Sequence, residues 1–239
     1  ESEAVSSYWT TKKRQLIMHL GGSGGSGKSH LIESIEEFVS RWGLNDTLCV
    51  CATTNIAGAR IGHRTWQYVM HCGFGVPAPA TDETKQMWST ILLVLLDELS
   101  MLSGYMLDKI DKRLQELKGN DLPFGGVHIV FIGDILQLPP VNARVMYYTD
   151  MFSKRWNTQT KKRQDRGIQE KHGNALWRSR LNTVILLDKN HRSNVGEFSD
   201  VLARMRIGNL KEGDLDYVNQ RCIKSDPKTA ADSMDEASK

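Results

Sequence analysis

Long apolar runs are missing from this chain of 239 residues. The longest candidate, residues 91–96, is far shorter than a membrane-spanning helix requires, so we expect no such helix in this sequence. No secretory signal is visible at its start. Hydrophobic residues make up 40% and charged residues 25%, which is typical of a globular chain long enough for one large α/β domain.

Cysteine is also scarce, and its spacing is uninformative for metal binding. The four cysteines are Cys49, Cys51, Cys72 and Cys222. They lack the paired spacing of a zinc site, although a cluster of Cys72 with His63 and His71 is an alternative. We expect reduced thiols, which favours an intracellular location.

A strong net charge is lacking too, since the formal value is +3 at pH 7. This balance neither requires nor excludes a nucleic-acid partner. Basic residues nevertheless crowd one short polar stretch, and they are Lys154, Arg155, Lys161, Lys162, Arg163 and Arg166. The stretch fits a phosphate-contacting loop or a nuclear-import signal, but its composition favours a solvated insertion. We expect a nuclear protein, with mitochondria as the alternative.

The most informative motif is a run of glycine and serine that ends in lysine and serine. It consists of Gly22, Ser23, Gly24, Gly25, Ser26, Gly27, Lys28 and Ser29, the complete G-x-x-x-x-G-K-[ST] pattern. An apolar run precedes it, and an amphipathic helical pattern follows up to Gly43. A flexible Gly/Ser linker is the alternative, but linkers do not end in Gly-Lys-Ser before an amphipathic helix. We expect backbone N–H groups to bind phosphates, with Lys28 on the β- and γ-phosphates and Ser29 on Mg²⁺.

Short apolar runs rich in β-branched residues alternate with helical patterns along the chain. After the first run, residues 16–20, they cover residues 47–54, 91–98, 127–134 and 183–188. Helical stripes end before Gly119 and Gly208. This alternation predicts an α/β fold with a predominantly parallel sheet and helices on both faces.

The polarity of the remaining segments sets the expected domain boundaries. We place one nucleotide-binding domain at residues 16–222, after an N-terminal extension of residues 1–15. Residues 142–170 are expected to form an irregular basic insertion, and residues 223–239 a polar tail.

Two adjacent acids, Asp97 and Glu98, end the third apolar run. Ligands of open α/β sheets bind at the carboxyl ends of the strands, so we expect Asp97 to hold Mg²⁺ and Glu98 to polarise an attacking water. The next run leads to Gln137, whose amide can hydrogen-bond the γ-phosphate or that water. An exposed glutamine in a turn is the alternative for Gln137.

The residues around Gln137 also carry a specific resemblance. Gly133-Asp134-x-x-Gln137-Leu138-Pro139-Pro140-Val141 is similar to the third signature motif of Pif/RecD-like superfamily-one DNA helicases. Further similar segments occur in the family's order, and they are residues 22–29, 52–65, 96–101, 123–126 and 190–192. The resemblance covers residues 16–222 and implies the first RecA-like, phosphate-loop motor domain of a Pif-type helicase. The similar Pif-type helicases include those carried by Helitron transposons (Helitron-like).

This resemblance implies a 5′-to-3′ helicase that uses ATP and Mg²⁺ and moves on single-stranded DNA, with roles in DNA repair, recombination and telomere maintenance. The catalytic residues it implies are Lys28, Asp97, Glu98, Gln137 and Arg192. The DNA contacts it implies are Thr53, Thr54, Arg60, Arg64, Thr65 and Trp66. Arg192 would contact the γ-phosphate. Trp66 would either stack on a base or lie in the core.

The chain departs from the family pattern at several positions. The family usually has glycine at the position of His63 and histidine at that of Gln67. Its adenine-contacting glutamine has no clear counterpart among residues 1–15, and nothing after Cys222 resembles a second motor domain. We therefore expect the chain by itself to bind Mg-ATP with little hydrolysis. The alternatives are a nucleotide-gated interaction module that docks through residues 142–170 and an ATPase that remodels protein.

Overall fold

The computed structural model describes residues 15–72, 79–141, 143–147, 161–191 and 196–220. The chain forms two compact units, one up to Arg192 and one from Ser193 on. This division falls inside the single domain that the sequence predicts.

The first unit is built on a six-stranded sheet with the strand order β3-β2-β4-β5-β1-β6. Every pairing within it is parallel. The strands are β1 (Ile17–Gly22), β2 (Leu48–Ala52), β3 (Arg64–Thr65), β4 (Leu93–Asp97), β5 (His128–Gly133) and β6 (Thr183–Leu187). Because parallel strands share their carboxyl edge, the segments after β1, β4 and β5 all begin at the same edge of the sheet.

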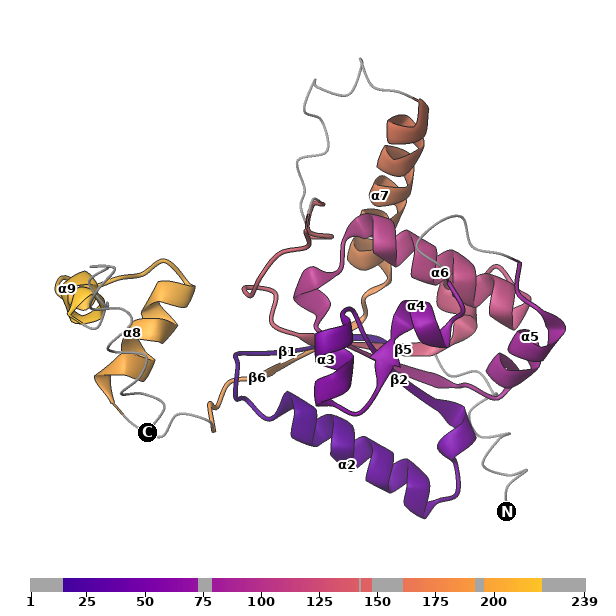
Figure 1. Cartoon of the computed structure of the whole chain (residues 1–239), viewed down its shortest axis with the longest axis horizontal. Helices are drawn as coiled ribbons and strands as arrows, with labels where there is room; N and C mark the ends of the chain where they lie inside the picture. The colour runs from indigo at the N-terminus through magenta and orange to yellow at the C-terminus, as the bar shows by residue number, and fades with distance from the viewer. Residues whose placement is uncertain (1–14, 73–78, 142, 148–160, 192–195, 221–239) are drawn as a thin grey trace, which may run out of the picture. The chain divides into compact units, whose positions relative to one another are not determined.

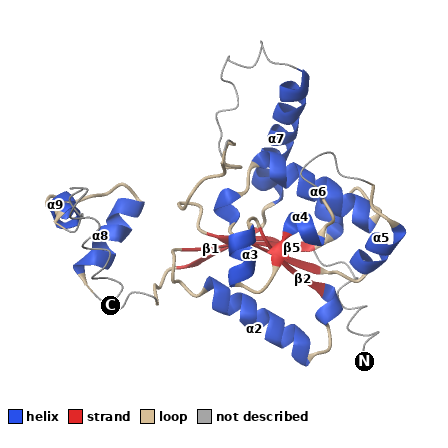
Figure 2. Ribbon diagram, viewed as in Figure 1, coloured by secondary structure: helices blue, strands red, loops and turns tan. Residues whose placement is uncertain are grey.

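Helices cover both faces of this sheet (Figures 1 and 2). Helix α2 (Lys28–Arg41) lies on one face, and α6 (Gly104–Lys118) with α7 (Lys161–Arg180) lies on the other. The shorter helices and 3₁₀ turns are α3 (Asn55–Arg60), α4 (Trp66–Val69), α5 (Asp82–Ser89), η1 (Asn45–Thr47), η2 (Leu99–Met101) and η3 (Pro123–Gly126). The structure thus confirms the α/β fold with a parallel sheet.

Alternating side chains along the strands build one hydrophobic cluster on each face of the sheet. Phe131 belongs to the cluster that includes Ile110 of α6, whereas its neighbour Ile132 belongs to the cluster that includes Ile32 of α2. All four side chains are at most 1% exposed. Full burial of such a side chain contributes about 1.5–3 kcal/mol, so the two clusters together fix the helices on the sheet.

The structure corrects the irregular insertion expected at residues 142–170, because α7 begins at Lys161 and is helical from there to Arg180. This helix packs closely on α6. A Cβ atom added to Gly173 would lie 1.8 Å from the carbonyl oxygen of Gly104. Since part of the contact is made by glycine backbones rather than large apolar side chains, the sequence of α7 shows little apolar periodicity.

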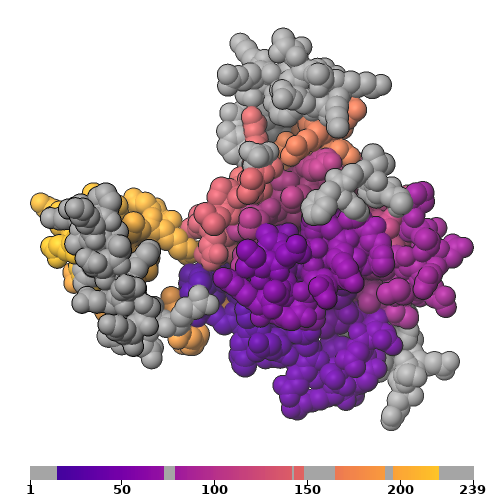
Figure 3. All heavy atoms as spheres, in the orientation of Figure 1, coloured from indigo at the N-terminus to yellow at the C-terminus, as the bar shows by residue number. Residues whose placement is uncertain are grey.

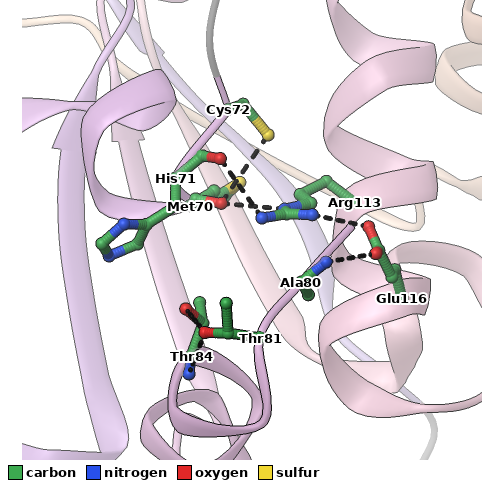
Figure 4. A network of polar contacts seen from close by, with 8 residues as sticks. All are labelled: Met70, His71, Cys72, Ala80, Thr81, Thr84, Arg113 and Glu116. Atoms are coloured by element: carbon green, nitrogen blue, oxygen red, sulfur yellow. Dashed lines mark hydrogen bonds and ion pairs between the residues drawn. The ribbon is translucent and has the colours of Figure 1, made fainter. Parts of the chain in front are cut away.

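A buried polar network joins α6 to the residues around α4 and α5 (Figure 4). The Arg113 side chain donates from Nε to the carbonyl of Met70 at 2.8 Å and from Nη2 to that of His71 at 3.2 Å. Its Nη1 lies 2.6 Å from Oε2 of Glu116. Glu116 in turn accepts a hydrogen bond from the N–H of Ala80 at 2.6 Å. Helix α6 therefore fixes residues both before and after the segment 73–78, which lies outside the described residues.

The second unit contains α8 (Glu197–Arg206) and α9 (Asp214–Asn219). Arg204 joins them by donating from Nε and Nη2 to the carboxylate of Asp214, at 2.7 and 2.6 Å. The Arg204 hydrogen bond, helped by the N–H of Lys211, lowers the pKa of Asp214 to about 2. Within the described parts of both units, no helix has the length and apolar character needed to cross a bilayer.

Candidate functional site

The predicted phosphate loop connects β1 to α2, as the motif requires. Its turn depends on glycine at Gly27, where φ is 94° and a side chain would be strained. Helix α2 begins at the next residue, Lys28, so the free N–H groups of its first turn face the loop. This arrangement is a ready-made anion site, because N–H groups and the positive end of the helix dipole point to one place.

A cavity of about 460 Å³ opens beside this loop. Its lining includes Gly24, Gly25, Gly27, Lys28, Ser29, Arg60, Asp97, Glu98, Asp134, Gln137 and His191. The glycine-rich loop, the acidic pair and Gln137 come from separate stretches of the chain but meet here. Ser26 is buried, and its hydroxyl lies under the loop, 2.4 Å from where a Cβ of Gly22 would be.

The ammonium group of Lys28 lies inside the loop. Its Nζ donates to the carbonyl oxygens of Gly22 and Ser23, at 2.8 Å each. Lys28 also acts on the acidic pair, since its charge opposes the rise in pKa that burial causes at Asp97 and Glu98. Lys28 is thus a cation of the phosphate loop that also acts electrostatically on the two carboxylates.

The acidic pair stands at the end of β4 with an unusual backbone. Glu98 has φ 58° and ψ 49°, a left-handed conformation that is costly for a residue with a side chain. Thr53 holds it in place, because its N–H donates to the carbonyl of Asp97 at 3.1 Å and its hydroxyl to that of Glu98 at 2.8 Å. Burial and the neighbouring Asp97 raise the pKa of Glu98, as suits a group that accepts a proton or polarises water.

Gln137 is oriented by Asp134, which sequence reasoning did not select as a site residue. The carboxylate of Asp134 accepts from the N–H of Leu136 at 3.0 Å and from Nε2 of Gln137 at 3.4 Å. The N–H of Gln137 donates to the carbonyl of Asp134 at 3.0 Å. Asp134 is 3% exposed, so its buried carboxylate is a fixed hydrogen-bond acceptor for the side-chain amide of Gln137. The sequence feature that could have identified Asp134 as a site residue is its position directly after a buried strand.

His191 brings the segment after β6 to the cavity. Its N–H donates to the carbonyl of Gly25 in the phosphate loop at 2.8 Å. The adjacent Arg192, which the resemblance assigns to the γ-phosphate, lies outside the described residues. Its role remains a prediction, and the position of His191 is the structural observation nearest to it.

Several threonines expected at DNA are engaged within the chain. Thr53 binds the acidic strand end, as described above. The Thr54 hydroxyl caps α3 by accepting a backbone N–H at 3.2 Å, and the Thr65 hydroxyl caps α4 at 3.4 Å. Their side chains therefore shape the turns around α3, and their contact with DNA stays a prediction.

The arginines expected at DNA occupy two different places. Arg60 lines the phosphate-loop cavity. Arg64 lines a second hollow of about 550 Å³, formed with Asn55, Ala59, Gly62 and His63. The guanidinium of Arg64 lies 5.4 Å from the centre of the Tyr68 ring. Both side chains are exposed, so each arginine is accessible from its own hollow.

Trp66 requires a correction, because its side chain is 2% exposed and belongs to the main hydrophobic cluster. A ring buried to this extent cannot stack on a base without leaving the core. Trp66 is therefore a core residue, and the expected base stacking by its ring is wrong.

The oxygen ligands in the cavity fit Mg²⁺. Such ions at phosphate-transfer sites take one or two protein oxygens, and phosphates and water complete the shell. The Ser29 hydroxyl and the Asp97 carboxylate, both in the cavity lining, supply that set. No group of three or more His, Cys, Asp or Glu side chains able to hold a metal occurs among the described residues. The donors therefore suit an ion shared with a nucleotide.

Comparison with known proteins decides the family. Residues 3–216 match the model of a family described as PIF1-like helicase. The chain belongs to the PIF1-like helicase family. The resemblance carried by the sequence motifs is thereby confirmed.

Curated relatives in this family are considerably longer than the chain. RRM3, an ATP-dependent DNA helicase of Saccharomyces cerevisiae, is 27% identical over 212 residues, which cover 83% of this chain and 26% of RRM3. PIF1, an ATP-dependent DNA helicase of the YJM789 strain of the same yeast, is 30% identical over 205 residues, covering 80% of this chain and 21% of PIF1. The chain therefore spans about a quarter of the length of these relatives.

Solved Pif1 structures share the fold. Bacteroides Pif1 bound to ssDNA superposes with a TM-score of 0.66 and 26% identity over 92% of this chain and 49% of the other. Pif1 from Bacteroides sp in complex with ADP-AlF4 superposes with a TM-score of 0.62 and is 27% identical, over 84% of this chain and 45% of the other. The chain spans about half of these Pif1 structures.

Proposed function

We propose that this chain is the ATP-binding motor domain of an ATP-dependent DNA helicase. In the whole protein, ATP hydrolysis would drive 5′-to-3′ translocation on single-stranded DNA and unwinding of duplexes. The observation that carries the proposal is one cavity in which the phosphate loop, the acidic pair and Gln137 meet. Membership in the PIF1-like helicase family supports it, as does the likeness to Pif1 structures that hold ssDNA or ADP-AlF4.

Nucleotide binding would begin at the first turn of α2. The backbone N–H groups of the loop and helix would receive the phosphates, and Lys28 would exchange the carbonyls of Gly22 and Ser23 for phosphate oxygens. Bound Mg²⁺ would neutralise the phosphate charge, with Ser29 and Asp97 as its protein ligands.

Hydrolysis requires a water aligned with the γ-phosphate. Glu98, which the Thr53 contact holds at the end of β4, would polarise that water. Gln137, oriented by Asp134, would hydrogen-bond the water or the phosphate and so report the nucleotide state. Arg192 is proposed to add a fixed charge to the same phosphate.

The proposed DNA contacts lie around α3 and β3. Arg64 is the side chain that the structure best supports for a DNA phosphate, because it borders an open hollow. Thr53, Thr54 and Thr65 are proposed to complete the track through backbone groups and hydroxyls, whereas Arg60 is proposed to act from the nucleotide cavity. A nuclear location and roles in repair, recombination and telomere maintenance remain proposals on the family's likeness alone.

Replacement of Lys28 tests the nucleotide site. Lys28→Ala is expected to abolish binding of a fluorescent Mg-ATP analogue, because the cation that contacts two phosphates is lost. Lys171→Ala, which removes the same charge from an exposed position on α7, is the matched control. Unchanged ATP affinity in Lys28→Ala would overturn the assignment. Little hydrolysis by the chain alone is expected in a turnover assay with single-stranded DNA, and robust DNA-stimulated hydrolysis would contradict that part.

A further inference from the structure

A polar contact joins the phosphate-loop helix to the turn that carries Arg64. Nε2 of His63 lies 2.7 Å from Oε1 of Glu36, and the two side chains are 28% and 33% exposed. Glu36 belongs to α2, whereas His63 lies between α3 and β3. In Figure 3 the early part of the chain, coloured indigo to purple, forms one continuous surface, and Figure 1 places α2 and α3 on it as neighbours.

The turn around His63 is tightly packed, so a displacement of the His63 side chain also displaces the residues beside it. The N–H of His63 donates to the carbonyl of Gly58 at 2.8 Å. A Cβ atom on Gly58 would lie 2.7 Å from the carbonyl oxygen of His63, which shows how closely the two backbones approach. The next residue, Arg64, pairs with Cys51 in the sheet and lines the second hollow.

Helix α2 connects this contact to the nucleotide. Glu36 stands eight residues after Lys28, or about 12 Å along an α-helix at 1.5 Å per residue. A helix of this length moves as a rigid element, so a displacement of its first turn also displaces Glu36. The first turn is where phosphates would bind under the proposed function.

We infer that His63 and Glu36 are positioning residues that link nucleotide occupancy of the phosphate loop to the placement of Arg64 against single-stranded DNA. The inference rests on the proposed function and adds a coupling route to it. Neither side chain lines the nucleotide cavity, which separates the link from the nucleotide contacts themselves.

The test measures coupling rather than affinity alone. The dissociation constant of a fluorescein-labelled oligo(dT) is determined with and without Mg-ATPγS for the whole chain and for His63→Ala and Glu36→Ala. We expect the nucleotide to change the DNA affinity of the unaltered chain by about fivefold or more, and DNA to change nucleotide affinity by the same factor. In either variant the ratio of the DNA dissociation constants without and with nucleotide is expected to fall to about one. In Glu36→Ala, a residue that lines neither hollow, binding of each ligand alone is expected to change less than about twofold.

Three further variants test whether the change in the coupling ratio comes from the His63–Glu36 contact. Glu37→Ala removes an equal charge from α2, where the partner is the exposed Arg41, and is expected to keep the ratio of the unaltered chain. The double variant His63→Ala with Glu36→Ala is expected to behave like either single variant, because one contact is lost in all three. Replacing the contact by an ion pair in the reverse orientation, His63→Glu with Glu36→Lys, is expected to restore part of the ratio, which a loss of general stability would not allow.

The possible outcomes distinguish a failure of this inference from a failure of the proposed function. A chain that binds both ligands with a coupling ratio of one overturns the inference and leaves the proposed function standing. Retention of the ratio in both His63→Ala and Glu36→Ala also overturns it. A chain that binds neither Mg-ATPγS nor oligo(dT) overturns the proposed function, and the inference falls with it.

Discussion

Replacing Arg113 by methionine should destabilise the first unit strongly. Arg113 is 4% exposed and donates to the carbonyls of Met70 and His71. Its loss would deprive both carbonyls and Glu116 of a cationic partner, and hydrogen bonds to charged groups contribute about 1.5–3 kcal/mol each. Methionine refills much of the space with apolar atoms. We therefore expect a loss of about 3–5 kcal/mol, typical of breaking a buried charge network from one side.

Urea unfolding followed by circular dichroism measures this loss, and the thermal midpoint should fall by roughly 10 °C, since each kcal/mol corresponds to about 2–4 °C at this size. Glu116→Gln is the matched control. Its side chain is 37% exposed, and the amide oxygen can still accept from one of its two donors, so its cost should be clearly smaller than that of Arg113→Met. If Arg113→Met costs less than about 1 kcal/mol, the network of Figure 4 does not support the unit as argued.

Two further changes test the site and the packing of α7. Burial and Asp97 raise the pKa of Glu98 in the folded chain, so its ionised form opposes folding. That penalty is absent below the unfolded-state pKa of about 4.3 and grows as pH rises through the folded value. Glu98→Gln should therefore raise the thermal midpoint at pH 7 with a gain that vanishes near pH 4, and a pH-independent gain would contradict this reasoning. Gly173→Ala should cost about 3 kcal/mol or more in urea unfolding, because its Cβ would lie 1.8 Å from the Gly104 carbonyl oxygen; a cost like that of the exposed control Ala175→Gly would refute the close contact.

Local patterns were sufficient for much of the fold. Each expected strand is present within a few residues, because a buried parallel strand needs a short, continuous apolar run that is visible in the sequence. Helix α6 ends before Gly119, where φ is 63°, because glycine adopts this conformation without strain. Helix α7 was missed, since glycine backbone packing at Gly173 leaves little mark on hydrophobic periodicity.

The sequence did not predict which aromatic side chains are exposed and which are buried. Trp66 lies in the core, whereas Phe38 of α2 and Trp42, directly after that helix, are 61% and 66% exposed. A pattern states which residues share a helix face, but burial depends on what packs against that face and how far it extends.

The sequence by itself determined the phosphate loop, the acidic strand end at Asp97 and the five longer strands of the sheet, because each depends on neighbouring residues and on backbone preferences. Only the tertiary structure decided that Asp134 orients Gln137, that Arg60 reaches the nucleotide cavity and that His63 meets Glu36. The Asp134–Gln137 contact forms within the turn after β5, whereas Arg60 at the cavity and the His63–Glu36 pair depend on separate segments of the chain. Their distances depend on the packing of the whole unit, which local sequence does not encode.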